Sequence, residues 1–224
     1  MLGSACRGEL LPSVIAGTRN GAKVRELTTL LDGVACLAPL PLDISLEYQE
    51  DGDETGETIE AIAAEKASAW SLRLRKPGSE PVVVASDGGL LVPALANRWD
   101  PTRTRRFAGA GAGAPARADA LIALADHLEG DQRRVGWREA VAFAKGGEVL
   151  ACFAAESVPG LLARNYSSWL LDADGFWVPA LWICPEFDGR RLAELTPEEQ
   201  ATREDHWRRL RREVLQAFRG ELGG

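Results

Sequence analysis

Long apolar runs and CxxC cysteine motifs are both missing from this 224-residue sequence. No stretch approaches the roughly 20 apolar residues that a membrane helix requires, and residues 1–11 contain no apolar run behind a basic start. The four cysteines, Cys6, Cys36, Cys152 and Cys184, form no CxxC pair, so we expect reduced, mostly buried thiols instead of a disulfide or zinc framework. Both absences favour a cytoplasmic protein without a membrane partner.

A broad basic surface is also absent. The formal net charge is −7, which argues against nucleic acid as a partner because nucleic-acid binders commonly rely on such a surface. An anionic ligand would then have to be held by a few local cations. Lysine is the scarce cation, since only four of the 26 basic residues are lysines: Lys23, Lys66, Lys76 and Lys145. Their positions are therefore informative.

The rest of the composition, with 46% hydrophobic and 26% charged residues, is that of a folded protein. Apolar runs predict strands at residues 12–17 and 81–85, a further apolar stretch covers 34–42, and alternating runs at 137–145 and 148–156 predict an antiparallel hairpin. Amphipathic patterns predict helices at residues 20–31, 58–75, 117–128 and about 197–218, the second capped by Thr55 or Thr58. These elements predict an α/β protein with a mixed sheet, in a single domain over residues 1–224.

The segment GTRNGAK links the first predicted strand to the first predicted helix. Free N–H groups and the dipole at the start of a helix favour an anion there. Lys23 lies in the first turn of this helix and could reach a phosphate that Thr18 and Asn20 approach with short polar side chains. Alternatively, Asn20 only caps the helix and Lys23 is a solvated surface residue.

Asp87 belongs to the segment SDGG, which follows the apolar run at residues 81–85. Open α/β sheets place their ligands beyond the carboxyl ends of such strands. We therefore expect Asp87 to take part in a binding site, with a capping role at the strand end as the alternative.

Four segments together resemble the inosine/xanthosine triphosphate pyrophosphatases, the Ham1-like family. VIAGTRNGAKVREL resembles the opening strand, turn and helix of that family, and ETGETIEAIAAEKA resembles its segment with an acidic-TG start and a Lys-Ala end. VVVASDGGLLVPAL resembles the strand that ends in paired acids, and TRTRRFAG resembles the Ser-x-Arg-aromatic-x-Gly turn. A weaker likeness continues through GFWVPALW and AELTPEEQ to DHWRRL, so the resemblance spans nearly the whole chain.

This resemblance implies an ITPase-like fold, with an elongated mixed β-sheet flanked by helices and two lobes with a nucleotide cleft between them. It implies hydrolysis of non-canonical purine nucleoside triphosphates to monophosphate and pyrophosphate with Mg²⁺, usually by a homodimer. Thr18, Asn20 and Lys23 would contact phosphates, while Lys66 would add a second cation and Asp87 would be a metal ligand or general base. The implied base-binding residues are Phe176, His206, Arg208, Thr104 and Arg106, although His206 could equally be a surface helix residue without a function.

The sequence departs from the family at the implied metal site. Ala61 stands where the helix usually has a metal-binding Glu, and Ser86 replaces the first of the paired acids. Glu65 and Glu57 are each four residues from position 61, on the same helical stripe, so either could supply the missing carboxylate. The alternative is that both are solvated surface charges.

Further departures affect the helix and the base. Ile62 stands where the family usually has an Asn, Pro179 replaces a base-reading Asp, and Gln200 replaces a Lys. Two hypotheses follow. The chain is either an active Mg²⁺-dependent pyrophosphatase with an altered metal shell, which the retained Lys23, Lys66 and Asp87 favour, or a descendant that binds nucleotide or a partner without turnover.

Overall fold

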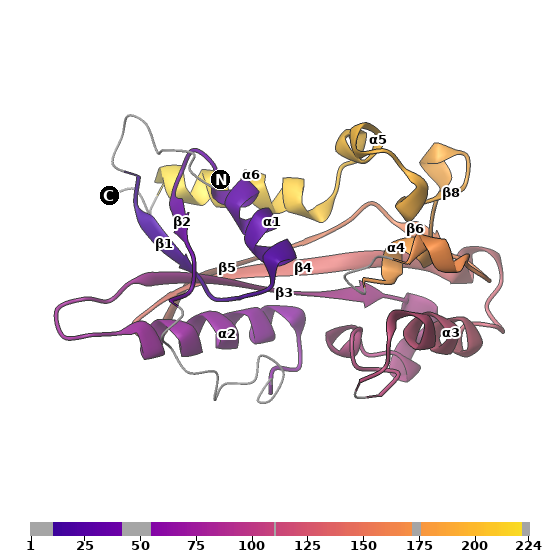
Figure 1. Ribbon diagram of the computed structural model, residues 1–224, viewed down its shortest axis with the longest axis horizontal. Coiled ribbons are helices and arrows are strands. Elements are labelled where there is room, and N and C mark those ends of the chain that lie inside the picture. The colour runs from indigo at the N-terminus through magenta and orange to yellow at the C-terminus, as the bar shows by residue number, and fades with distance from the viewer. Residues whose placement is uncertain (1–10, 42–54, 110, 172–175, 221–224) are drawn as a thin grey trace. The chain divides into compact units, whose positions relative to one another are not determined.

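The computed structural model describes residues 11–41, 55–109, 111–171 and 176–220, and Figure 1 shows the order of its elements. The strands are β1 (Ser13–Ala16), β2 (Cys36–Ala38), β3 (Val82–Leu91), β4 (Arg134–Lys145), β5 (Glu148–Glu156), β6 (Gly160–Leu162), β7 (Trp182–Cys184) and β8 (Arg190–Arg191). The α-helices are α1 (Gly21–Leu31), α2 (Ile59–Leu74), α3 (Ala114–Leu124), α4 (Val178–Leu181), α5 (Pro197–Thr202) and α6 (His206–Gly220). Short 3₁₀ helices lie between several of these elements.

The strands form a mixed sheet in the order β2-β1-β3-β4-β6-β7-β8, and β5 pairs with β4. β1 runs parallel to β2 and β3, whereas β6 is antiparallel to β4 and β7 is antiparallel to both β6 and β8. Gly146 and Gly147 connect β4 to β5 and both have positive φ, which suits a tight hairpin turn. The predicted α/β class, mixed sheet and hairpin are confirmed.

The chain divides into two compact units, and each has a core of its own. The first unit comprises Met1–Asp87, Glu139–Ala155 and His206–Gly224, and the second comprises Gly88–Arg138 and Glu156–Asp205. Strands β3, β4 and β5 each contribute residues to both units.

Helices cover both faces of the sheet in the first unit. One face packs against α1 and α6 through the buried side chains of Val84 on β3 and Val141 and Phe143 on β4. The other face packs against α2, and alanines such as Ala85 and Ala142 line it. In Figure 1, α1 and α6 accordingly lie on one side of these strands and α2 on the other. Because successive strand residues point to opposite faces, the residues of each strand alternate between the face toward α1 and α6 and the face toward α2.

The second unit has a core of aromatic and aliphatic side chains from η1 (Pro93–Arg98), α3, α4 and strands β6 and β7. A buried arginine joins its loops. The Arg133 guanidinium donates hydrogen bonds to the carbonyl oxygens of Leu162, Ala125, Leu128 and Ala163. It therefore hydrogen-bonds four backbone carbonyls from separate segments and links those segments together.

Several predicted boundaries are wrong, and α3, for example, spans Ala114–Leu124 instead of residues 117–128. The last helix does not run unbroken from residue 197 to 218, because Arg203 has an extended backbone and separates α5 from α6. The Arg203 side chain is buried at this break, and its guanidinium donates to Glu186 Oε1 at 2.8 Å. The strand predicted at residues 81–85 does not end at Ala85 but continues to Leu91.

The cysteine prediction is wrong at two positions. Cys36 is disulfide-bonded, and Cys152 is exposed instead of buried. Cys184 is a buried free thiol, as expected, and Cys6 lies outside the described residues. The cysteine pattern therefore gives no support for a reducing compartment.

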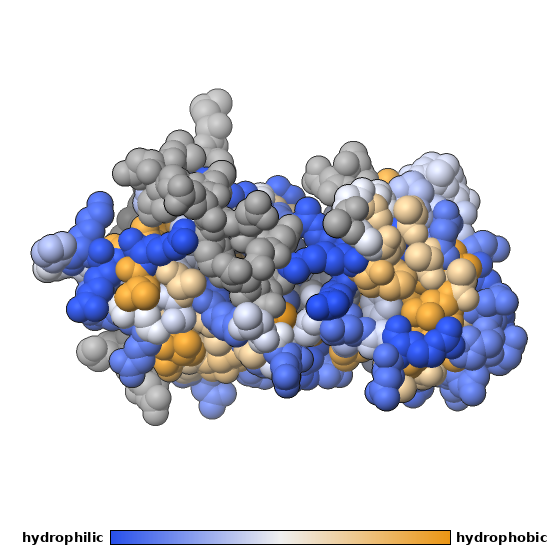
Figure 2. Space-filling view, turned by 90° about the horizontal axis from the view of Figure 1, so that it is seen from below, coloured by the Kyte–Doolittle hydropathy of each residue, from blue (hydrophilic) through white to orange (hydrophobic). Residues whose placement is uncertain are grey.

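The surface seen in Figure 2 intersperses hydrophilic residues with apolar ones. Large apolar side chains that are exposed in the first unit are Leu72, Val149 and Leu150. Within the described part of the chain, no helix has the length and apolar character needed to cross a membrane.

Candidate active site

The turn between β1 and α1 is held tightly against β3. The Gly17 N–H donates to the Val84 carbonyl oxygen at 2.7 Å. A Cβ atom at Gly17 would lie only 3.1 Å from Val83 Cγ1 and 3.2 Å from the Val84 carbonyl oxygen, so the close approach favours glycine. The turn thus places the start of α1 beside the middle of β3.

Thr18 and Asn20 use their side-chain oxygens within this turn. Thr18 Oγ1 accepts a hydrogen bond from the Asn20 N–H at 3.1 Å. Asn20 Oδ1 accepts from the N–H groups of Ala22 at 2.9 Å and Lys23 at 3.5 Å, so Asn20 is the N-cap of α1. These two residues order the turn, and their contact with a phosphate stays a prediction.

Lys23 is not the solvated surface residue of the alternative interpretation. Its Nζ donates a 2.8 Å hydrogen bond to the Ser86 carbonyl oxygen. The same nitrogen lies 4.0 Å from Asp87 Oδ1, and 28% of the side chain is exposed. The first turn of α1 therefore places an ammonium group on β3, with part of its surface open to solvent.

Asp87 lies inside β3 and is 9% exposed, so it does not cap a strand end. Strand alternation places it on the same face as Ala85, toward α2. From that helix, Lys66 Nζ donates to Asp87 Oδ1 at 2.7 Å. The structure thus brings Lys23, Lys66 and Asp87 together from three separate elements.

Glu139 on β4 also joins this group, and sequence reasoning missed it. It is only 3% exposed, and its Oε1 lies 3.8 Å from Lys23 Nζ. Strand alternation would have indicated its burial, because Glu139 shares a face with Val141 and Phe143. We call Lys23, Lys66, Asp87 and Glu139 the ion cluster. Its two ammonium and two carboxylate groups balance in formal charge.

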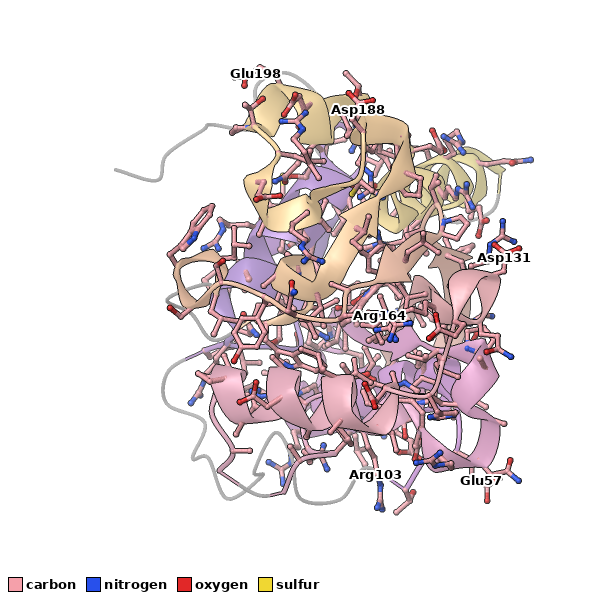
Figure 3. The ribbon with its side chains drawn as sticks, turned by 90° about the vertical axis from the view of Figure 1, so that its right-hand side faces the viewer. Glu57, Arg103, Asp131, Arg164, Asp188 and Glu198 are labelled. Carbon is pink, nitrogen blue, oxygen red and sulfur yellow. The ribbon has the colours of Figure 1, made fainter. Side chains whose placement is uncertain are left out.

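Glu65 and Glu57, the other two predicted metal ligands, have surroundings of their own, and their binding of a metal ion stays a prediction. The Glu65 carboxylate accepts hydrogen bonds from the N–H and hydroxyl of Thr55 and from the N–H of Gly56. Glu57 is exposed and points away from the ribbon (Figure 3). No group of three or more His, Cys, Asp or Glu within the described ranges is arranged to hold a metal ion. The three predicted metal carboxylates are therefore not gathered at one place.

The start of α2 explains why positions 61 and 62 are apolar here. A Cβ atom at Gly56 would lie 2.8 Å from the Ile62 nitrogen and 3.0 Å from Ala61 Cβ, so the preceding loop packs directly on the helix. Ile62 itself is 2% exposed. Thr58, one of the two predicted caps, accepts a hydrogen bond from the Ala61 N–H at 3.1 Å.

The predicted base-binding residues are divided between the units. Phe176 belongs to the second unit, is 45% exposed, and packs edge-to-face on Trp137 with ring centroids 5.5 Å apart. Arg106 is an exposed residue of the same unit.

Thr104, also in the second unit, is 6% exposed. Its hydroxyl accepts from the Leu90 N–H and donates to the Pro101 carbonyl, so it serves the local fold. His206 and Arg208 lie at the start of α6 in the first unit. Base binding by this set stays a prediction.

Comparison with known proteins identifies one family. The family model described as "Ham1 family" matches residues 14–215. A search of curated proteins gives no significant match.

Solved structures show a similar fold. A HAM1 protein from Coxiella burnetii superposes with a TM-score of 0.69 at 21% identity, covering 92% of this chain and 100% of that one. The Ham1 protein of Staphylococcus aureus gives 0.67 at 21% identity, with 92% and 97% coverage. A nucleoside-triphosphatase, or dITP/XTP pyrophosphatase, from Mycobacterium abscessus gives 0.63 at 28% identity, with 85% and 92% coverage.

Proposed function

The chain belongs to the Ham1 family, and on this premise we propose that it hydrolyses non-canonical purine nucleoside triphosphates, such as those of inosine and xanthosine, to monophosphate and pyrophosphate. The observation that carries the proposal is the ion cluster, in which Lys23 and Lys66 meet at the buried Asp87. The M. abscessus structure, described as a dITP/XTP pyrophosphatase, supports the substrate class.

The lysines would offset the negative charge of the triphosphate. Lys23 stands at the start of α1, where the helix dipole also favours an anion. Lys66 reaches the same place from α2 and is 17% exposed. Bound phosphates would thus meet two ammonium groups from opposite sides of β3, and charge neutralisation of this kind is the main requirement of phosphoryl-group chemistry.

Asp87 would orient or deprotonate the attacking water. Its Oδ1 lies 2.7 Å from Lys66 Nζ and 4.0 Å from Lys23 Nζ, and these two cations would hold the carboxylate in one orientation. A positioned carboxylate at hydrogen-bond distance from water is a common general base.

The oxygen donors at this place suit Mg²⁺. Asp87 offers a carboxylate, and Mg²⁺ prefers such hard oxygen ligands, with water and phosphate oxygens in its other positions. We propose that Asp87 holds the ion together with the substrate. When bound, Mg²⁺ would neutralise charge on the phosphate oxygens. We further propose a homodimer in the cytoplasm, as the family resemblance implies.

Pyrophosphate release tests the proposal. We expect Mg²⁺-dependent release from inosine and xanthosine triphosphates and their deoxy forms, and much slower release from ATP and GTP. A nucleotide-binding protein without turnover is the second candidate, favoured because the described residues gather no three-ligand metal group. Binding of inosine triphosphate without pyrophosphate release at high Mg²⁺ would select that candidate.

A further inference from the structure

We infer that Glu139 is a positioning residue for Lys23, and that its buried carboxylate fixes the ammonium group and limits how tightly the site binds an anion. This inference rests on the proposed phosphate-binding role of Lys23. It assigns a function to a strand residue that no sequence motif indicated.

Burial makes a charge partner necessary for Glu139. A carboxylate that is 3% exposed loses most of its hydration, and such a group is tolerated only beside compensating charge or hydrogen bonds. Lys23 Nζ supplies positive charge at 3.8 Å. Glu139 lies on the same face of the sheet as Val141, and this face packs against α1. Because α1 carries Lys23, the two side chains approach each other from the sheet and from the helix that covers it.

Lys23 is held by two different kinds of contact. The Ser86 carbonyl accepts its hydrogen bond at 2.8 Å and fixes the position of the nitrogen. Glu139 contributes charge at 3.8 Å, a distance too long for a good hydrogen bond. Because the pair is mostly removed from water, this charge is little screened.

The two carboxylates of the ion cluster differ in their closest lysine. Asp87 has its close partner in Lys66 at 2.7 Å, and Lys23 is farther from it, at 4.0 Å. Lys23 Nζ lies 3.8 Å from Glu139 and 4.0 Å from Asp87, so Glu139 shares with Asp87 the task of balancing the Lys23 charge. Asp87 can then engage water or metal while Lys23 stays in place.

Electroneutrality has a measurable consequence. Removing the Glu139 charge leaves the ion cluster with one net positive charge, so an anion should bind more tightly. The same change loosens Lys23, so turnover should fall. Glu139→Gln should therefore lower KM and kcat together, a pattern that loss of folded structure alone does not produce.

The test measures binding of inorganic pyrophosphate by calorimetry without divalent metal. Glu139→Gln should bind about tenfold more tightly than the wild type, the order expected for loss of one nearby charge, and the gain should shrink at high salt. Glu139→Asp keeps the charge, so its affinity should stay within about threefold of the wild type. Glu80→Gln is the matched control, because Glu80 forms an exposed ion pair with Arg75 in the same unit.

Thermal unfolding gives a second measurement that needs no ligand. Lys23→Met leaves the Glu139 carboxylate without this cation and should lower Tm. Adding Glu139→Gln to Lys23→Met should restore part of the loss, whereas two unrelated sites would give additive losses.

The outcomes separate this inference from the proposed function. Pyrophosphate binding that Lys23→Met removes but Glu139→Gln leaves unchanged or weakens overturns the role of Glu139 alone. Additive losses of Tm in the double variant overturn it as well. Failure of the wild type to bind pyrophosphate, or binding that Lys23→Met does not affect, overturns the phosphate site itself and this inference with it.

Discussion

Asp87→Asn is the substitution that separates chemistry from binding in the ion cluster. Asn has the shape of Asp and keeps an oxygen that Lys66 can donate to, but it carries no charge and cannot take up a proton from water. The 2.7 Å contact between Lys66 Nζ and position 87 can therefore persist as an ordinary hydrogen bond. Any change in activity then reports the lost charge and basicity.

The expected loss of stability follows from this contact. A hydrogen bond to a charged group contributes about 1.5–3 kcal/mol and a neutral one about 0.5–1.5 kcal/mol, so the exchange should cost about 1–2 kcal/mol. For a chain of this length each kcal/mol lowers Tm by about 2–4 °C, which gives a fall of about 2–8 °C. The protein should remain folded.

Turnover should fall much further than stability. Loss of a general base or metal carboxylate costs at least about 100-fold in kcat, as pyrophosphate release from inosine triphosphate would show. Pyrophosphate binding should be unchanged or tighter, because a negative charge near Lys23 has been removed. Asp32→Asn is the control for an Asp-to-Asn substitution outside the ion cluster, because the Asp32 side chain is 83% exposed. Turnover by Asp87→Asn within about tenfold of the wild type, at unchanged Mg²⁺ dependence, would refute the role of Asp87.

Three further expectations concern other residues. Glu65→Gln should lower Tm by a few degrees through weaker contacts with Thr55 and Gly56 and leave the Mg²⁺ requirement unchanged, and a raised requirement would return Glu65 to the metal site. Gly56→Ala should be strongly destabilised in urea unfolding, because its Cβ would lie 2.8 Å from a backbone nitrogen of α2, and wild-type stability would contradict this packing. Burial raises the pKa of the Cys184 thiol to about 11, so near neutral pH this thiol should resist iodoacetamide until the protein unfolds. The exposed Cys152 should react first. Equal rates of the two thiols in the folded protein would count against this assignment.

The order of elements could be predicted because hydrophobic periodicity is local. The run before Gly17 and the amphipathic pattern after Asn20 gave β1 and α1 nearly to the residue. The end of β3 was misjudged, because the sequence SDGG has the composition of a turn. Pairing with the neighbouring strands outweighs that local preference and carries the strand through both glycines to Leu91.

The candidate site was predictable only where a motif marks it. Lys23, Lys66 and Asp87 stand in segments with a family resemblance, and the structure brings them together. The hydrogen bonds that Glu65 accepts from Thr55 and Gly56 could not be predicted, because helical spacing tells which stripe a residue shares but not which loop folds over it. Glu139 lies in no motif, and its importance comes from a neighbour more than 100 residues earlier in the chain.

The ion cluster suggests that charge balance, more than the position of each acid, constrains this site. Ser86 stands where the family resemblance would place an acid, and its buried hydroxyl has no hydrogen-bond partner in the described part of the structure. By strand alternation Ser86 shares the face of Val84, the face that Glu139 also occupies from β4. β3 thus has a serine on this face, and its neighbour β4 has a carboxylate there, on the side from which Lys23 approaches. A lysine held in a mostly buried place needs counter-charge, and Glu139 supplies it to Lys23 on this face at 3.8 Å, in addition to Asp87 at 4.0 Å.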